Sequence, residues 1–73
     1  MKNSFIRFYS SNYDEVTCSL RHRDDVNEYT IYSEMSYNRI SGDIHISFTP
    51  DCPLDLVARA REAFRFIKFI VSL

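Results

Sequence analysis

Residues 49–73, TPDCPLDLVARAREAFRFIKFIVSL, hold the change from a strand pattern to a helix pattern that decides the fold. Pro50 and Pro53 cannot donate a backbone hydrogen bond to a sheet, so a preceding strand must end here. Pro53 suits the first turn of a helix, and the carboxylate of Asp55 is stabilised near the positive end of the helix dipole. We therefore expect a helix that runs to about Ile70.

The expected helix carries two separate apolar sets. When its residues are placed at about 100° per step, the broader set forms a stripe that we expect to cover a sheet, made of Leu56, Val57, Ala60, Ala63, Phe64, Ile67, Ile70 and Val71. The second set lies roughly opposite, flanked by Asp55, Arg59 and Glu62, and consists of Ala58, Phe66, Phe69 and Leu73. A narrow basic ridge completes the surface with Arg61, Arg65 and Lys68.

The second apolar set is the most informative feature, because a helix on one sheet hides only about half of its circumference. Aromatic anchors rimmed by charged residues are typical of protein interfaces. We expect Arg59, Phe66, Phe69 and Leu73 to anchor a partner protein or a second copy of the chain, while Arg61, Arg65 and Lys68 tune its approach by charge.

Two other interpretations of the helix end remain open. Residues 64–73 can instead form a C-terminal strand or fold back, which would bury the phenylalanines within the same molecule. The helix can also lie on a membrane surface, but the shortage of Lys and Arg on a wide polar face disfavours this. A membrane partner is not expected.

Four strands are predicted before the helix. Residues 4–10 are rich in Phe, Ile and Tyr, and in residues 15–23 the side chains of Val16, Cys18, Leu20 and His22 alternate with polar ones. In residues 28–37 the better core face is Tyr29, Ile31, Ser33, Met35 and Tyr37. After a turn at Gly42, the side chains on the core face of the last strand are expected to be Ile44, Ile46 and Phe48.

Short polar turns between all four strands favour an antiparallel meander. Asp24, Asp25 and Asn27 supply one such turn, and the neighbouring carboxylates of Asp14 and Glu15 lie in another. The sequence therefore predicts an α+β fold, a four-stranded antiparallel β-meander followed by one C-terminal helix packed on the sheet (ββββα). At 73 residues the chain is expected to be a single domain, 1–73.

The sequence shows no catalytic or metal-binding pattern. Cys18 and His22 are four residues apart on one strand face, His45 lies on another face, and Cys52 precedes the helix. These residues share no zinc-ligand spacing, and they do not bring together a nucleophile, a base and an orienting group. The single glycine excludes a glycine-rich phosphate loop. We expect no enzyme activity, no metal and no cofactor.

The first nine residues do not resemble a secretory signal, since Arg7 interrupts a short apolar run. We therefore expect a cytoplasmic protein, in which Cys18 and Cys52 stay as thiols. The longest apolar-rich stretch is residues 64–73, far shorter than the about 20 residues of a membrane span.

Nucleic-acid binding is the alternative function. The candidate residues lie on the outer face of the sheet, where basic and aromatic side chains can neutralise and stack on a single strand, and they are Arg21, Arg23, Tyr32 and Arg39. Glu34 on the same face and a net charge of −1 oppose it.

The expected function is thus a small non-enzymatic protein-binding module, an inhibitor or adaptor that occludes a partner protein's surface, or a homodimer formed through the helix. Compact counter-defence proteins of phages and other mobile elements, anti-CRISPR proteins among them, share this general profile, although a shared profile is not evidence of a shared function.

Overall fold

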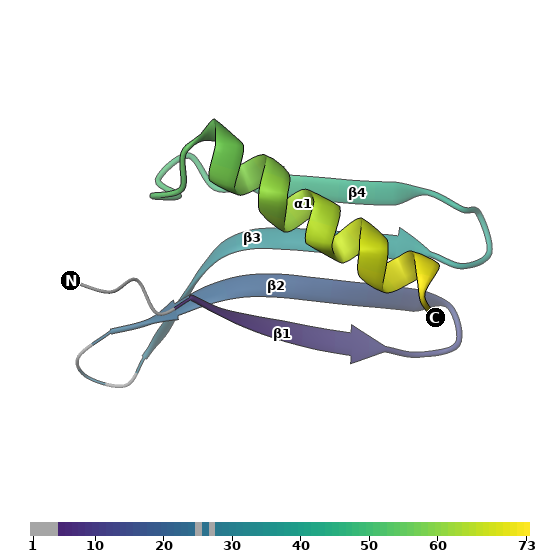
Figure 1. Cartoon of the computed structure of the whole chain (residues 1–73). Helices are drawn as coiled ribbons and strands as arrows, with labels where there is room; N and C mark the ends of the chain where they lie inside the picture. The colour runs from purple at the N-terminus through teal and green to yellow at the C-terminus, as the bar shows by residue number, and fades with distance from the viewer. Residues whose placement is uncertain (1–4, 25, 27) are drawn as a thin grey trace.

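A computed structural model describes residues 5–24, 26 and 28–73 of the chain. Its elements are β1 (Phe5–Ser11), β2 (Glu15–Arg23), β3 (Tyr29–Asn38), β4 (Ile44–Phe48) and α1 (Leu56–Val71) (Figure 1). All four strands form one antiparallel sheet in the order β1-β2-β3-β4, and the predicted ββββα arrangement is confirmed. Ser4 of the predicted first strand, and Asp25 and Asn27 of the predicted turn, lie outside the described residues.

Side-chain amides fix the two turns at one end of the sheet. The Asn12 Oδ1 accepts hydrogen bonds from the backbone amides of Asp14 and Glu15, and the Asn38 Oδ1 accepts from those of Ile40 and Ser41. Asn is favoured in turns because its side chain bonds to the backbone a few residues on. Gly42 follows with a φ of 81°, in the left-handed region that favours glycine.

The helix begins at a side-chain cap. The Asp55 carboxylate accepts a hydrogen bond from the Ala58 amide at 2.8 Å, which satisfies one of the free donors of the first turn. The guanidinium of Arg59 donates to the carbonyls of Leu54 and Cys52, so the helix is also tied to the loop before it. Because α1 continues to Val71, the strand or fold-back considered for residues 64–73 is not formed.

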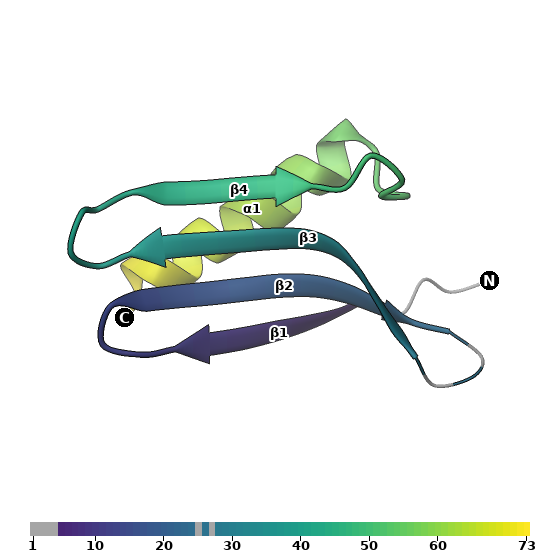
Figure 2. The ribbon, with the colours of Figure 1, turned by 180° about the vertical axis from the view of Figure 1, so that it is seen from behind.

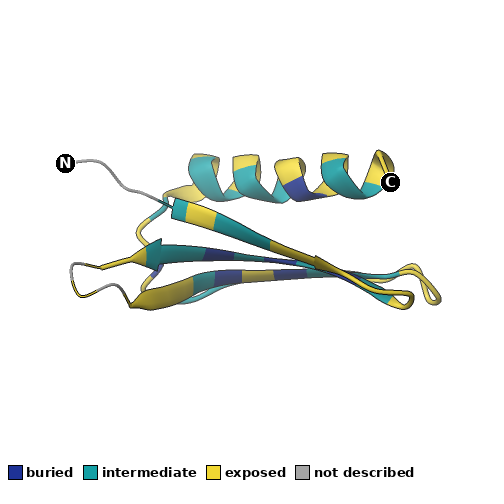
Figure 3. Cartoon of the chain, turned by 90° about the horizontal axis from the view of Figure 1, so that it is seen from below, coloured by how far each residue is buried: buried dark blue, intermediate teal, exposed yellow. Residues whose placement is uncertain are grey.

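The sheet and the helix form two layers with the core between them (Figure 3). Figure 2 views the sheet from behind, where no element of the described residues covers it. The core cluster joins two strands to the helix and contains Val16, Cys18, Met35 and Phe66. The predicted inward face of β2 is confirmed, since Val16, Cys18 and Leu20 are buried.

A β-bulge exchanges the two faces to which the side chains in the first half of β3 point. Leu20 pairs with Ser33, but Arg21 pairs with Ile31, so β3 contains one extra residue, Tyr32, at this point. From Ser33 onward the odd-numbered side chains of β3 face the helix, whereas before the bulge those of Tyr29 and Ile31 point to the outer face. The prediction that Tyr29 and Ile31 belong to the core face is therefore wrong, because side chains alternate with a period of two and one inserted residue exchanges the faces.

Among the described residues, no helix combines the length and the apolar character needed to cross a membrane.

Candidate protein-binding face

The helix presents to the sheet the second apolar set, which was predicted to face outward. Phe66 is 1% exposed and lies in the core, and the ring centroid of Phe69 is 4.5 Å from that of Tyr9 on β1. The prediction that Phe66 and Phe69 anchor a partner is therefore wrong, because both side chains are used within the molecule. Arg59 is half-buried against the loop, so it is not a free anchor either.

The stripe predicted to cover the sheet is instead largely exposed. Leu56 is 82% exposed, Phe64 61% and Val71 78%, values unusual for large apolar side chains gathered on one helix face. We define the docking face as the exposed apolar face of α1, formed by Leu56, Val57, Ala60, Phe64, Ile67 and Val71. Of the predicted anchors, Leu73 is exposed beyond the end of the helix.

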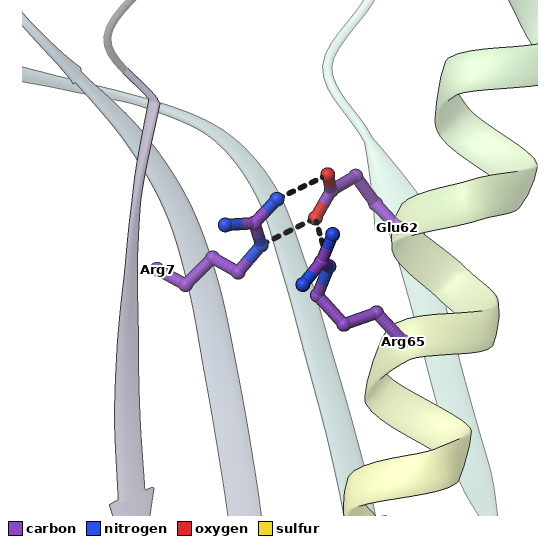
Figure 4. Close-up of polar contacts among 3 residues, drawn as sticks. All are labelled: Arg7, Glu62 and Arg65. Carbon is purple, nitrogen blue, oxygen red and sulfur yellow. Dashed lines mark hydrogen bonds and ion pairs between the residues drawn. The ribbon is translucent and has the colours of Figure 1, made fainter.

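A charged contact explains which face of the helix points inward. Arg7 on β1 donates two hydrogen bonds to Glu62, from Nε to Oε1 at 2.7 Å and from Nη2 to Oε2 at 2.6 Å (Figure 4). Bidentate arginine–carboxylate pairs are strong and directional. The hydrogen bond with Glu62 also raises the pKa of Arg7, whose positive charge is thereby favoured.

Glu62 lies on the same side of the helix as Phe66, so its pairing with Arg7 and the burial of the Phe66 ring support one orientation. The side chain of Glu62 is 15% exposed and that of Arg7 29%, so turning the helix around would leave a largely desolvated charge without its partner. Arg65 is the third member of the contact, at 3.9 Å from Glu62 through its Nε. This longer, more exposed contact is much weaker.

The basic ridge adjoins the docking face. Arg61, Arg65 and Lys68 are all exposed, and together with Phe64 they line a shallow hollow of about 220 Å³. The Lys68 Nζ lies 5.7 Å from the centroid of the Phe64 ring. Within the described part of the chain, neither Arg61 nor Lys68 has a carboxylate partner. The ridge thus offers positive charge beside an exposed aromatic ring.

The residues proposed for nucleic-acid binding do not form one surface. The Arg21 guanidinium lies 4.2 Å from the Phe8 ring centroid on the outer face of the sheet, whereas the Tyr32 ring contacts Phe5 on the helix side. Arg39 donates to the Ser11 hydroxyl and the Asn12 carbonyl at the turn end of the sheet. Arg23 lies at the opposite end of β2, where it pairs with Tyr29. The bulge and the strand length separate these residues.

The outer face of the sheet has a second hollow, of about 400 Å³. The charged or titratable residues that line it on this outer face are Glu15, Arg21, Glu34 and His45. Arg21 is held by a hydrogen bond from its Nε to the Ser19 hydroxyl at 2.9 Å. In residues 5–24, 26 and 28–73 no three His, Cys, Asp or Glu side chains are grouped so that they could hold a metal ion. Nothing in this hollow pairs a nucleophile with a base.

Both cysteines are free thiols, as predicted, and both are buried. Burial raises the pKa of the Cys18 thiol, and burial also raises the pKa of Tyr9, its neighbour across the β1–β2 pair. Neither group is therefore set up to act as a nucleophile near neutral pH.

The raised pKa values predict a loss of stability in alkali. The unfolded chain releases these protons at lower pH than the folded chain, so the contribution of the two groups to the free energy of unfolding is constant below the usual thiol pKa of 9.0 and falls as the pH rises above it. Urea unfolding from about pH 7 to pH 10 measures this slope. The Cys18→Ala variant is expected to have a shallower slope, and an unchanged slope would exclude the thiol as its source.

Comparison of the chain with protein-family models, with curated proteins and with solved structures found no match.

Proposed function

We propose that this protein is a non-enzymatic protein-binding module that acts as an inhibitor or adaptor by covering a partner's surface with the docking face. The observation that carries the proposal is the row of exposed apolar side chains along α1, with Leu56, Phe64 and Val71 all more than half exposed. Exposed apolar patches with a charged rim mark interaction sites, and a central aromatic residue is the usual anchor of such a site.

The charge beside the docking face favours an acidic partner over a second copy of the chain. If two helices packed antiparallel with Phe64 at the two-fold axis, Arg61 of one would lie within about 2 Å, along the axis, of Lys68 of the other at 1.5 Å rise per residue. The helix has no free carboxylate to offset this repulsion, because Asp55 caps the helix and Glu62 bonds to Arg7. Like charges placed together oppose association.

The partner that fits is therefore a protein segment with apolar side chains flanked by Asp or Glu. Its apolar side chains would cover Phe64 and Ile67, while its carboxylates would meet Arg61 and Lys68. The ridge then supplies a salt-dependent contribution to the association rate, and the apolar contact supplies most of the binding energy.

The proposal is tested by site-specific photo-crosslinking followed by binding measurements. A benzophenone side chain in place of Leu56 or Val71 should crosslink a partner protein in cells, whereas the same group in place of His45, on the opposite side of the sheet, should not. Crosslinking from position 45 alone would place the binding site elsewhere and contradict the proposal.

With the purified partner, Phe64→Asp is expected to weaken binding by about 30-fold or more, the loss of a central anchor worth about 2 kcal/mol. The variant should stay folded because Phe64 is 61% exposed. The double variant Arg61→Glu with Lys68→Glu should slow association and remove its salt dependence. Equal affinity of wild type and Phe64→Asp, measured by calorimetry, would exclude the docking face.

A further inference from the structure

Strand β1 is the open edge of the sheet. The strand order places β1 and β4 at the two edges. The helix runs diagonally, starting beyond β4 and ending over β2, and its ribbon does not pass over β1 (Figure 1); the reverse view shows the same arrangement (Figure 2). An edge strand presents unpaired backbone N–H and C=O groups, which are a template for another strand.

The sequence of β1 lacks most of the features that usually protect such an edge. Its seven residues, FIRFYSS, include no proline, no glycine and no lysine, and its pairing with β2 is continuous. Its one charged side chain, Arg7, points toward the helix. An inward charge can protect an edge strand, but here the charge is paired with Glu62 of the same chain. By contrast, β4 is only five residues long, and Pro50 and the loop to the helix follow it.

The strand is also complementary to itself. If two copies of β1 pair antiparallel over their full length, Phe8 lies opposite Phe8, Arg7 opposite Tyr9, and Ile6 opposite Ser10. Aromatic pairs across strands are favourable, and this register brings no like charges together. The docking face lacks this property, since its own pairing would oppose Arg61 and Lys68.

We propose that two copies of this chain associate through β1, which joins their sheets into one continuous antiparallel sheet with Phe8 at the two-fold axis. The axis of such a pairing is perpendicular to the sheet, so both helices lie on the same side of it. Two docking faces then point in one direction. A partner that offers two acidic apolar segments, or a repeated surface, would be bound with the added affinity of a bivalent contact.

Disulfide trapping tests the register without disturbing Phe8. The chain is prepared as Ile6→Cys and, separately, as Ser10→Cys, two positions outside the core. In the proposed register position 6 of one copy lies opposite position 10 of the other, with Cβ atoms about 5 Å apart, close enough for a disulfide. Cysteines at the same position of the two copies are offset by four residues along the strands, which is about 13 Å at about 3.3 Å per residue, too far for a disulfide.

Under mild oxidation, a mixture of the two variants is expected to give many-fold more covalent dimer than either variant alone. Wild type treated in the same way is the control for the buried Cys18 and Cys52. Light scattering of untreated wild type should give the mass of a dimer, and Phe64→Asp should leave that mass unchanged. A monomer at every concentration, or equal trapping in mixed and single samples, would overturn the proposal.

A dimer that Phe64→Asp converts to monomer would also overturn it, and would assign self-association to the docking face instead. The two proposals fail separately. Loss of the β1 dimer leaves partner binding by the helix intact, whereas a failure of Phe64→Asp to weaken partner binding leaves the trapping result intact.

Discussion

Phe66→Ala is expected to lower the free energy of unfolding by about 3–5 kcal/mol, the usual cost of replacing a buried phenylalanine by alanine. The side chain is 1% exposed and belongs to the core cluster with Val16, Cys18 and Met35. A chain of this size has a total stability of about 4–11 kcal/mol, so the substitution removes a large part of it. Phe66→Leu keeps most of the volume and should cost about 1–2 kcal/mol.

The matched control is Phe64→Ala, two residues away on the same helix. Phe64 is 61% exposed, so its truncation should change stability by no more than about 0.5 kcal/mol. Urea unfolding followed by circular dichroism measures both variants. If Phe64→Ala instead lowers the free energy of unfolding more than Phe66→Ala, the helix packs on the sheet through the face that contains Phe64. That is the arrangement predicted from the sequence periodicity.

Glu62→Lys is expected to cost about 3 kcal/mol. The substitution removes the partner of Arg7 and places a third cation beside Arg7 and Arg65 in a contact that is only partly open to water. Because Arg7 is 29% exposed, some of its charge can be solvated again, which keeps the cost at the lower end for a broken ion pair. Thermal unfolding should show a clear drop in the midpoint.

Two further variants distinguish the effect of the Arg7–Glu62 pair on stability from an effect of net surface charge. Arg65→Glu changes a partner at 3.9 Å that is 55% exposed, and it should shift stability by less than about 1 kcal/mol. The exchange Arg7→Glu with Glu62→Arg should recover part of the loss caused by Glu62→Lys, because it restores a pair of opposite charges. No recovery, together with a full effect of Arg65→Glu, would show that Glu62 acts through net charge alone.

Local patterns in the sequence predicted the elements of this fold. Period-two alternation marked Val16, Cys18 and Leu20 as the inward face of β2, and burial confirms it. The prolines after β4 predicted the end of the sheet, and the carboxylate of Asp55 predicted the start of the helix, where Asp55 is the N-terminal cap. The prediction that Pro53 lies in the first turn is wrong, because Pro53 is two residues before this cap. These features depend on backbone hydrogen bonding and side-chain periodicity within a few residues, so they are readable from the chain alone.

The tertiary structure decided which faces became core and which became surface. Periodicity places Phe66 and Phe64 on nearly opposite sides of one helix, but it does not tell which side packs on the sheet. The choice of side depended on the bond between Glu62 and Arg7, 55 residues away, and on the packing of Phe66 against Val16 and Met35. Likewise, the extra residue at Tyr32 exchanged the faces of β3. The sequence by itself determined the order and type of the elements, because these are set by neighbours along the chain. The docking face and the open edge follow from contacts between distant residues, which only the folded chain brings together.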